Sequence, residues 1–352
     1  MRIGIDYRLA NCSHRGMARY CREIVKKLLV LDNDNKYLLF IDSISNDSFV
    51  DYDNVEYVKI NTSNFIVGEQ IIIPFLLYRK KCDVFWSPYN TFPVILPSST
   101  RLVVTVHDVI FFYSLSYKMN YKQRIGALYR RYILKLFYSH VDKYLTVSQY
   151  SKKEILNYLD IRVPIEITYN CIGNISKYVN NKGRSDNLDE NYFFTLSGDS
   201  PSKNLDVLLR VFERYYPDLR LVVGGVSKLS PFRKRQSKQI CFLDEGISDD
   251  LLVQYYLNCR CFLFCSKYEG FGIPVIEAAI CGKPIIASNT TSIPEILDGK
   301  GWLIDPTEEG IKNSIADFLK GDKEMDCNYS ASINKFTDWI VPAKKVLESL
   351  IK

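Results

Sequence analysis

Short apolar runs alternate with segments of helical spacing along the chain, and this alternation limits the fold more than any other feature. Runs typical of strands lie at residues 37–41, 101–106 and 219–224, and helix-like segments fall between several such runs. Strands that are joined through helices lie side by side and point the same way, so the pattern predicts parallel sheets covered by helices. The chain is therefore expected to belong to the α/β class.

A polar stretch at residues 174–191 divides this pattern into two halves. It carries few apolar residues, and a second series of strands begins directly after it. A chain of 352 residues is long enough for two separate cores. We expect a first Rossmann-like domain at 1–173, a linker at 174–191, a second Rossmann-like domain at 192–335, and a terminal helical segment at 336–352.

Composition narrows the classes of partner. Charged residues make up 24% of the chain and the formal charge is +6, an excess that suits phosphates or anionic surfaces but is too small to indicate nucleic acid. The ten cysteines show no disulfide-like framework, and the closest group, Cys259, Cys261 and Cys265, sits in or beside an apolar strand. Since no signal-peptide pattern and no run long enough to span a bilayer are present, we expect a cytoplasmic protein that is soluble or peripheral at the inner face of the plasma membrane.

Residues 267–282 combine two carboxylates with a glycine-containing turn. An apolar strand precedes them, and a helix is expected to begin near Pro274, because proline is tolerated in a first turn. Glu269 then lies at the carboxyl end of a strand, beside the amides of residues 270–272 at the amino end of a helix, a position that binds anionic ligands. Glu277, about one helical turn further, can face the same side. Taken alone, the spacing also fits a strand, turn and helix with two incidental carboxylates.

Three other places in the sequence carry candidate ligand-binding residues. The strand at 101–106 ends in T-V-H-D, which puts His107 and Asp108 at its carboxyl edge, although a locally hydrogen-bonded histidine is the ordinary explanation. Lys203 precedes a helix, and a solvated helix residue is one explanation of it. Gly16 lies in a turn before the first helix, and it can let the backbone approach a ligand or simply connect strand and helix.

Residues 118–138 form a strongly amphipathic segment with many basic side chains. Its apolar residues share one helical face: Tyr121, Ile125, Leu128, Tyr129, Tyr132, Ile133, Leu136 and Phe137. Two interpretations stay open. In one, the helix packs this face on the sheet and its basic rim is solvated; in the other, it lies on a membrane and meets anionic lipid.

The run S-K-Y-E-G-F-G-I-P-V-I-E-A-A-I-C-G-K-P-I-I-A-S from Ser266 to Ser288 resembles the signature of a large family of retaining glycosyltransferases, group 1 or family 4, whose members carry two glutamates separated by seven residues. The segments S-H-R-G-M-A-R-Y, V-V-T-V-H-D-V-I-F-F and S-I-P-E-I-L-D-G resemble further landmarks of the family, as does the K-N pair at Lys203. The resemblance extends from the first strand to Pro306. It implies the GT-B fold, in which two Rossmann-like domains face each other across a cleft and a C-terminal helix crosses back to the first.

The resemblance also implies roles for individual residues. Lys203 would neutralise the donor diphosphate, Glu277 would hold the ribose hydroxyls, and His107 would close the site from the first domain. The implied catalytic residues are His107, Lys203 and Glu269. The implied donor-binding residues are Gly16, Asp108, Lys203, Glu269, Gly270, Phe271, Gly272, Ile273 and Glu277. No metal ligand is expected, since no D-x-D pair stands near the presumed diphosphate, and no cofactor is expected beyond the nucleotide sugar.

The implied reaction is retaining transfer of a hexose, such as mannose, from a GDP-, UDP- or dTDP-sugar to a hydroxyl acceptor. The acceptor would be a carbohydrate or a lipid-linked saccharide, in the synthesis of surface polysaccharide or lipid-linked oligosaccharide. One departure stands out: the family's arginine beside Lys203 is absent, and Ser202 or Asp199 stands there. Either Arg15 or another distant cation compensates, or donor binding is weakened. Two alternatives stay open: a nucleotide-sugar epimerase of the same architecture, and a catalytically weak nucleotide-sugar-binding subunit.

Overall fold

The structure, a computed structural model, describes residues 1–12, 16–42, 49, 52–113, 121–172, 179, 191–321 and 324–352. These residues form two compact units, the first unit (Met1–Asn170 with Trp339–Lys352) and the second unit (Cys171–Asp338). The chain leaves the first unit after Asn170 and returns to it after Asp338, against expected boundaries at 173 and 335. Apart from Val179 and Asn191, the expected linker lies outside the described residues.

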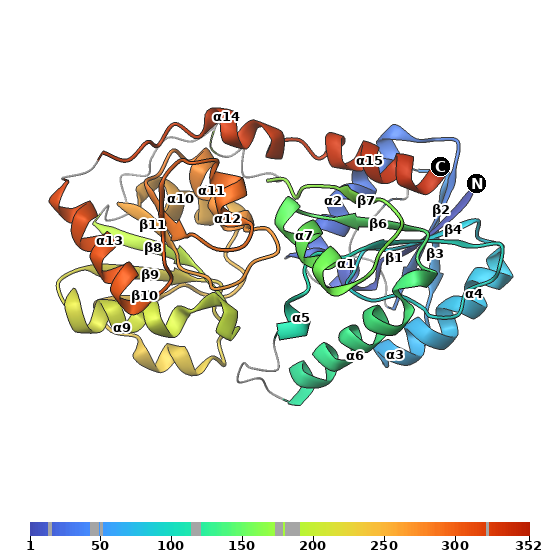
Figure 1. Cartoon of the computed structure of the whole chain (residues 1–352), viewed down its shortest axis with the longest axis horizontal. Helices are drawn as coiled ribbons and strands as arrows, with labels where there is room; N and C mark the ends of the chain where they lie inside the picture. Colours follow the sequence, from blue (N-terminus) through green and yellow to red (C-terminus); the bar gives the residue numbers. More distant parts are fainter. Residues whose placement is uncertain are drawn as a thin grey trace. The chain divides into compact units, whose positions relative to one another are not determined.

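The strands of the first unit are β1 (Arg2–Asp6), β2 (Lys36–Ile41), β3 (Val55–Lys59), β4 (Val84–Ser87), β5 (Arg101–Thr105), β6 (Lys143–Thr146) and β7 (Ile165–Ile167). They form one parallel sheet of order β3-β2-β1-β4-β5-β6-β7 (Figure 1). In register, Ile5 of β1 pairs with Leu39 on one side and Trp86 on the other. The strand order reverses at β1, and ligands of such sheets bind outside the carboxyl ends of the strands at that point.

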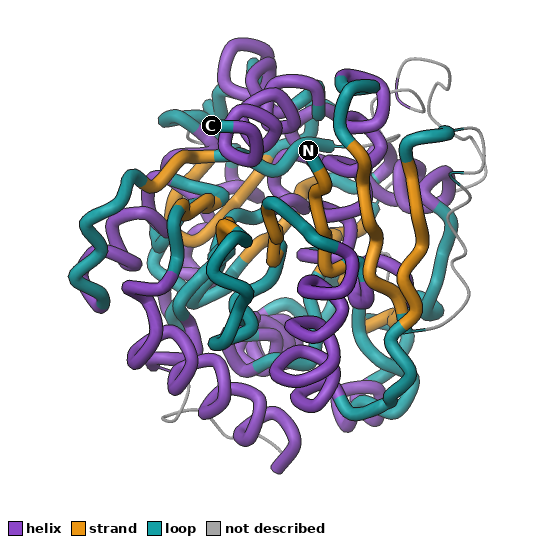
Figure 2. The backbone as a smooth tube through the Cα atoms, turned by 90° about the vertical axis from the view of Figure 1, so that its right-hand side faces the viewer, coloured by secondary structure: helices purple, strands orange, loops and turns teal. Residues whose placement is uncertain are grey.

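The helical segments of the first unit are α1 (Arg8–Cys12), α2 (Met17–Leu31), α3 (Phe65–Val67), η1 (Gly68–Ile72), α4 (Ile73–Lys80), α5 (Ile110–Tyr113), α6 (Tyr121–Phe137), η3 (Tyr138–His140), α7 (Gln149–Tyr158) and α15 (Ile340–Ile351). Figure 1 shows α2 and α15 on one face of the sheet and α4 and α6 on the other, and in Figure 2 helices likewise cover both faces of the strands. The segment that begins with α3 starts at Asn64, whose Oδ1 accepts the backbone N–H groups of Ile66 (3.0 Å) and Val67 (3.2 Å).

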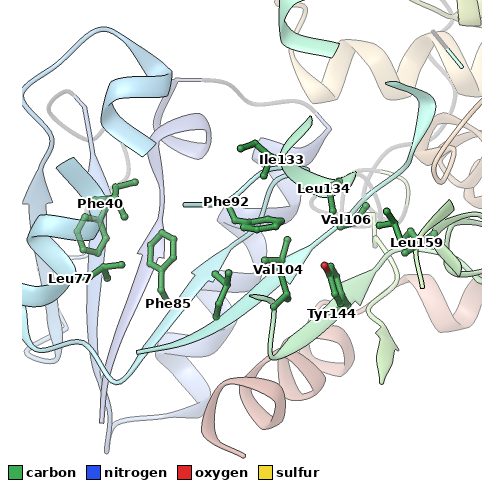
Figure 3. Packing of buried hydrophobic residues seen from close by; sticks show 14 of the residues in the cluster. Phe40, Leu77, Phe85, Phe92, Val104, Val106, Ile133, Leu134, Tyr144 and Leu159 are labelled. Atoms are coloured by element: carbon green, nitrogen blue, oxygen red, sulfur yellow. The ribbon is translucent and has the colours of Figure 1, made fainter. Parts of the chain in front are cut away.

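The core on the α4 and α6 side of this sheet is made of residues from strands and helices far apart in the chain (Figure 3). Phe40 and Phe85 come from β2 and β4 and meet edge to face, with ring centroids 5.9 Å apart. Leu77 of α4 joins them, while Ile133 and Leu134 attach α6 to the same cluster. This packing holds α6 against the sheet through one of its faces.

The strands of the second unit are β8 (Tyr192–Leu196), β9 (Arg220–Gly224), β10 (Ile240–Phe242), β11 (Cys261–Phe264), β12 (Ile285–Ser288) and β13 (Trp302–Ile304). They form a second parallel sheet of order β10-β9-β8-β11-β12-β13. Its helical segments are η4 (Pro201–Lys203), α9 (Leu205–Tyr215), η5 (Pro231–Arg235), α10 (Asp249–Asn258), α11 (Ile273–Ile280), α12 (Ile293–Leu297), α13 (Glu308–Lys320), α14 (Ser330–Ile333) and η6 (Asn334–Phe336). Two parallel sheets flanked by helices confirm the α/β class and the Rossmann-like character of both units.

The end of the chain belongs to the first unit. Helix α15 packs against α2, and the ring of Trp339 lies 6.1 Å from that of Tyr20. Lys345 forms an ion pair with Glu166 (2.8 Å), and the Arg101 guanidinium donates to the carbonyl of Ser349 (3.2 Å). The prediction that a C-terminal helix returns to the first domain is therefore confirmed.

Two sequence expectations concern the cysteines and the membrane. Cys259, Cys261 and Cys265 are buried in the second unit as free thiols, and burial raises the pKa of Cys265 to about 12. Such thiols behave as core side chains. Within the described part of the chain, no helix combines the length and apolar character that a bilayer crossing requires.

Candidate functional site

An ion pair joins the carboxyl ends of two neighbouring strands in the second unit. Lys203 follows β8 at the end of η4, and Glu269 follows β11, which pairs with β8. The Nζ atom of Lys203 lies 2.7 Å from Oε1 and 2.9 Å from Oε2 of Glu269, and the two side chains are 27% and 11% exposed. The structure thus brings together two residues predicted for the donor site, at the sheet edge where ligands of this architecture bind.

The loops that carry this pair are tied to each other. The backbone N–H of Lys267 donates to the carbonyl of Ser202 (2.7 Å). The side-chain amide of Asn204 donates to the carbonyls of Cys265 (3.1 Å) and Pro306 (2.8 Å). These bonds fix the spacing between the lysine loop and the glutamate loop. Asn204 was seen in the sequence only as part of a K-N pair, so its structural role was missed.

Glu277 lies in α11, the helix that follows the glutamate loop, and is 2% exposed. The hydroxyl of Tyr256 donates to its Oε2 atom (3.0 Å), and burial followed by the charge of Glu277 holds the pKa of Tyr256 well above its ordinary value. The tyrosine therefore stays a hydrogen-bond donor and orients the carboxylate. Tyr256 comes from α10, and nothing in the sequence marked it as a partner of Glu277.

The turn between the two glutamates is held by hydrogen bonds from residues that follow β12. Thr291 Oγ1 accepts the N–H of Glu269 (3.2 Å), and Ser292 Oγ donates to the carbonyl of Phe271 (2.5 Å). Gly272 adopts φ +114°, and a Cβ there would lie 2.6 Å from Cδ1 of Ile293. Only glycine fits this turn without strain. Of the other residues predicted for donor binding, Phe271 is buried, whereas Gly270 and Ile273 are partly buried.

His107 lies at the carboxyl end of β5 in the first unit and is 5% exposed. Its backbone N–H donates to Oδ1 of Asn90 (2.7 Å), and its Nε2 atom lies 2.9 Å from the carbonyl oxygen of Pro88. Burial lowers the pKa of His107 to about 4. The ring is therefore neutral near pH 7, and because a carbonyl can only accept, Nε2 carries the proton and Nδ1 is an acceptor.

Two other residues of the first unit were predicted for donor binding, Asp108 and Gly16. The Asp108 carboxylate accepts the backbone N–H of Ile110 (3.1 Å), at the start of α5. Gly16 is exposed at the start of α2 with φ +54°. Arg15, the cation suggested as a replacement for the missing arginine, lies outside the described residues. In the second unit, the hydroxyl of Ser202 is hydrogen-bonded to that of Ser200 (2.9 Å), so this position supplies no charge.

A buried carboxylate that the sequence did not reveal lies in the π-helical turn η1. Glu69 is fully buried and accepts hydrogen bonds from the hydroxyls of Thr91 (2.9 Å) and Tyr129. Burial raises its pKa to about 7. The first unit therefore holds a neutral histidine and a carboxylate that titrates near neutrality, both under its carboxyl edge.

Helix α6 contradicts the expectation that its whole apolar stripe packs on the sheet. Only part of the stripe is covered, with Ile133 buried beside Ala127 and Leu134. Five apolar residues are 42% to 79% exposed and form the α6 row: Tyr121, Ile125, Leu128, Tyr132 and Leu136. Four of them line a hollow of about 630 Å³ with Ile66 of α3 and with Arg131 and Lys135. The error arose because a helical period shows that apolar residues share a face without showing which side meets the core.

Comparisons with known proteins cover nearly the whole chain. Residues 179–334 match the family model described as Glycosyl transferases group 1, and residues 15–173 match the model described as Glycosyltransferase Family 4. The chain is 25% identical to O-antigen chain mannosyltransferase B of Escherichia coli, over 87% of each chain.

Two further similarities extend the comparison. The chain is 25% identical to the Campylobacter jejuni N-acetylgalactosamine-N,N'-diacetylbacillosaminyl-diphospho-undecaprenol 4-alpha-N-acetylgalactosaminyltransferase, over 62% of this chain and 60% of that protein. Its fold is similar to the crystal structure of HepE from Anabaena in complex with UDP and glucose, with a TM-score of 0.66, 15% identity, and coverage of 99% of this chain and 98% of that chain. The structural likeness shows the same two-unit fold.

Proposed function

The chain belongs to the group 1 (family 4) glycosyltransferases of the GT-B fold, and from this membership we propose that it transfers a sugar from a nucleoside diphosphate donor to a hydroxyl group with retention of configuration. The observation that carries the proposal is the pair of Lys203 and Glu269 on the adjacent loops after β8 and β11. A cation that already lies against a carboxylate can exchange that partner for a donor diphosphate, which frees the carboxylate to accept sugar hydroxyls.

The donor would lie along the carboxyl edge of the second sheet. Lys203 and the amino end of α11 would stabilise the charge that develops on the departing diphosphate. Glu269 and the backbone of residues 270–273 would hold the sugar, and Glu277 would accept the ribose hydroxyls, oriented by Tyr256 (3.0 Å).

The transfer step would take place on the front face of the sugar. The bond between the anomeric carbon and the diphosphate oxygen breaks, the acceptor oxygen bonds to that carbon on the same face, and the leaving phosphate oxygen takes the acceptor proton. His107, neutral and with Nδ1 as an acceptor, would contact the donor sugar, and Asp108 and Gly16 would contribute to donor binding. Charge on the diphosphate is assigned to Lys203 rather than to a metal, so activity lost with a chelator and restored by Mn²⁺ would overturn that assignment.

The donor is identified by binding. A thermal-shift screen with UDP-, GDP- and dTDP-sugars should raise the midpoint for one nucleotide, because a ligand that binds the folded state stabilises it. Transfer is then measured with the selected donor and a panel of saccharide acceptors. Product with retained configuration supports the proposal, whereas interconversion of the donor without an acceptor would indicate an epimerase.

Ser202 favours a second candidate, a nucleotide-sugar-binding subunit with weak catalysis. Where the family carries an arginine, this chain has a hydroxyl that is bonded to Ser200 (2.9 Å between the Oγ atoms). Donor binding without turnover over any acceptor, and activity indifferent to Glu269→Ala, would favour this candidate over the enzyme.

The acceptor is proposed to be a lipid-linked saccharide used in surface polysaccharide synthesis, reached at the cytoplasmic face of a membrane. The name of the Campylobacter relative specifies a diphospho-undecaprenol acceptor, which supports this class. The α6 row offers the apolar contact, and Arg131 and Lys135 beside it offer attraction to anionic headgroups.

Membrane contact is tested by co-sedimentation with phosphatidylglycerol vesicles. Replacing Arg124, Arg131 and Lys135 by Gln should reduce the bound fraction at physiological salt, because each basic residue near an anionic surface contributes about 1 kcal/mol. The matched control replaces three exposed lysines of the second unit, Lys228, Lys234 and Lys238. Equal binding by both triple variants would rule out the α6 surface as the membrane contact.

A further inference from the structure

Arg130 of α6 is a partly buried cation whose guanidinium has no hydrogen bond or ion pair with any residue that the structure describes. Its Cζ atom lies 5.9 Å from the centroid of the Phe111 ring of α5. Burial lowers the pKa of Arg130, and the charge of Asp108 opposes that shift. A guanidinium carries five donors, and leaving them unmatched in a desolvated position costs free energy.

Three other sheltered arginines of the first unit are matched. Arg8 forms an ion pair with Asp6 (2.7 Å), and the Arg22 guanidinium donates to the carbonyl of Ala10. Arg101 donates to the carbonyl of Ser349 (3.2 Å). Arg130 differs from these three and shares its unmatched state with the neighbouring Arg131, and two unmatched cations side by side suit an anionic partner.

The surroundings of Arg130 suit such a partner. Gly126, one turn earlier on α6, has no side chain, and a Cβ there would meet Nη1 of Arg130 at 3.5 Å, so this flank of the guanidinium is left uncovered. Arg131 adds a second cation nearby, 5.8 Å from the ring centroid of Phe112. The two rings come from α5, which begins two residues after Asp108, at the carboxyl edge of the first sheet.

We propose that Arg130 binds a phosphate of the acceptor, with its planar donors on two phosphate oxygens and Arg131 as a supporting charge. The inference rests on the proposed function, because it assigns to the acceptor of that reaction a phosphate or diphosphate ester between lipid and sugar. A bidentate contact is the geometry in which arginine recognises phosphate. The negative charge of Asp108 acts on Arg130 and would repel a phosphate. The phosphate ester is therefore expected on the side of the guanidinium that faces away from the Asp108 carboxylate.

The test is equilibrium binding to the full chain, measured by titration calorimetry. The probes are farnesyl diphosphate, farnesol and inorganic pyrophosphate, and the parent protein carries Lys203→Met so that the donor-side cation does not contribute. In this parent, Arg130→Gln should weaken farnesyl diphosphate binding at least tenfold and leave farnesol binding unchanged. Arg130→Lys, which keeps the charge but loses the fork, should weaken it by about threefold.

The matched control is Arg162→Gln, which removes an exposed arginine of the same unit and should change farnesyl diphosphate binding less than twofold. Pyrophosphate binding with the same dependence on Arg130 supports the phosphate contact. Unchanged farnesyl diphosphate binding in Arg130→Gln, an equal loss for farnesol, or an equal effect of Arg162→Gln would overturn the proposal.

Two further measurements separate this proposal from its neighbours. If Arg130→Gln reduces sedimentation with phosphatidylglycerol vesicles as much as farnesyl diphosphate binding, the ligand is a phospholipid headgroup and the acceptor assignment is wrong. Thermal shifts with nucleotide sugars on chains that retain Lys203 report the donor site independently. A chain that binds farnesyl diphosphate through Arg130 but binds no nucleotide sugar would contradict the proposed function and leave the phosphate site standing.

Discussion

The predicted site residues at the carboxyl edges of the two sheets differ in how their charges are paired. At the edge of the second unit, Lys203 is paired with Glu269 (2.7 Å) and Glu277 is held by Tyr256 (3.0 Å). At the edge of the first unit, His107 is buried and neutral, and Arg130 has no ion pair among the described residues. The predicted site residues of the second edge are therefore already paired, whereas His107 and Arg130 of the first edge have no ion-pair partner in the described part of the chain, although Arg8 and Asp6 at the end of β1 form an ion pair (2.7 Å).

The sharpest test of this contrast removes the cation of the second edge. Lys203→Met should lower kcat/KM by about 10² to 10³, because it deletes a fixed charge beside the proposed position of the departing diphosphate and leaves Glu269 unpaired. The measurement is initial rate against donor concentration, with Lys228→Met as a control on an exposed lysine of the same unit. A loss below threefold for Lys203→Met would show that the ion pair is structural and that the two edges do not differ in the way described.

The next effect concerns the buried groups of the first unit, whose pKa values move in opposite directions. Unfolding returns the pKa of His107 from about 4 to its ordinary value near 6.5. The contribution of His107 to stability is therefore present above pH 6.5 and is lost as pH falls toward 4. Folding raises the pKa of Glu69 from 4.5 to about 7. The contribution of Glu69 to stability is therefore present below pH 4.5 and is lost as pH rises through 7. Each contribution is about 3 kcal/mol in order of magnitude.

The variant Glu69→Gln separates the two contributions. It removes the loss on the alkaline side, so the free energy of unfolding of the variant relative to the wild type should rise by about 3 kcal/mol from pH 4.5 to 7. The variant itself should gain stability with pH up to 6.5, through His107. Urea unfolding followed by circular dichroism at five pH values provides the measurement. A difference between variant and wild type that does not change with pH would mean that Glu69 is not a neutral acid in the fold.

Most of the fold follows from local patterns. The apolar runs and helical spacings predicted each of the two parallel sheets, and the turn with Pro274 predicted a helix that the structure begins at Ile273. The segment containing η1 was not identified, because a π-helical turn between two short helices has no single period. For α6 the period was visible, but the covered side depends on how the helix meets the sheet.

The candidate site was predictable only in part. Glu269, Glu277 and Lys203 stand in motifs, so the sequence identified them one by one. Their mutual positions depend on β8 and β11 being neighbours, which spacing along the chain does not reveal. Asn204 and Tyr256, which hold the site residues in place, could not be predicted either, since each forms a hydrogen bond with a residue more than 20 positions away in the chain. Arg130 was found only through the partners that it lacks in the described structure.

The two loop glycines extend the contrast between the edges to the backbone. Gly272 in the second unit has φ +114° and a Cβ would lie 2.6 Å from Ile293, whereas Gly16 in the first unit has φ +54° and a Cβ would meet no described atom within 4 Å. Gly272→Ala should therefore cost about 2 kcal/mol of stability and Gly16→Ala about 1 kcal/mol, since both strain the backbone but only one collides. Thermal unfolding of the two variants checks the order, and equal midpoints would contradict the tighter packing of the second edge.

The smallest effect sharpens the contrast within the second edge itself. Glu277→Gln keeps an oxygen for the Tyr256 hydroxyl but loses the charge that, in the proposed donor complex, would strengthen hydrogen bonds from ribose hydroxyls, so donor affinity should fall by about tenfold. Calorimetric titration with the selected nucleotide sugar measures it, and Glu309→Gln, an exposed glutamate of the same unit, serves as the control. Because ribose lies away from the reacting carbon, kcat at saturating donor should change less than twofold. A large fall in kcat with unchanged affinity would instead place Glu277 beside the reacting carbon. The assignment of Glu277 to the nucleotide part of the second edge would then be wrong.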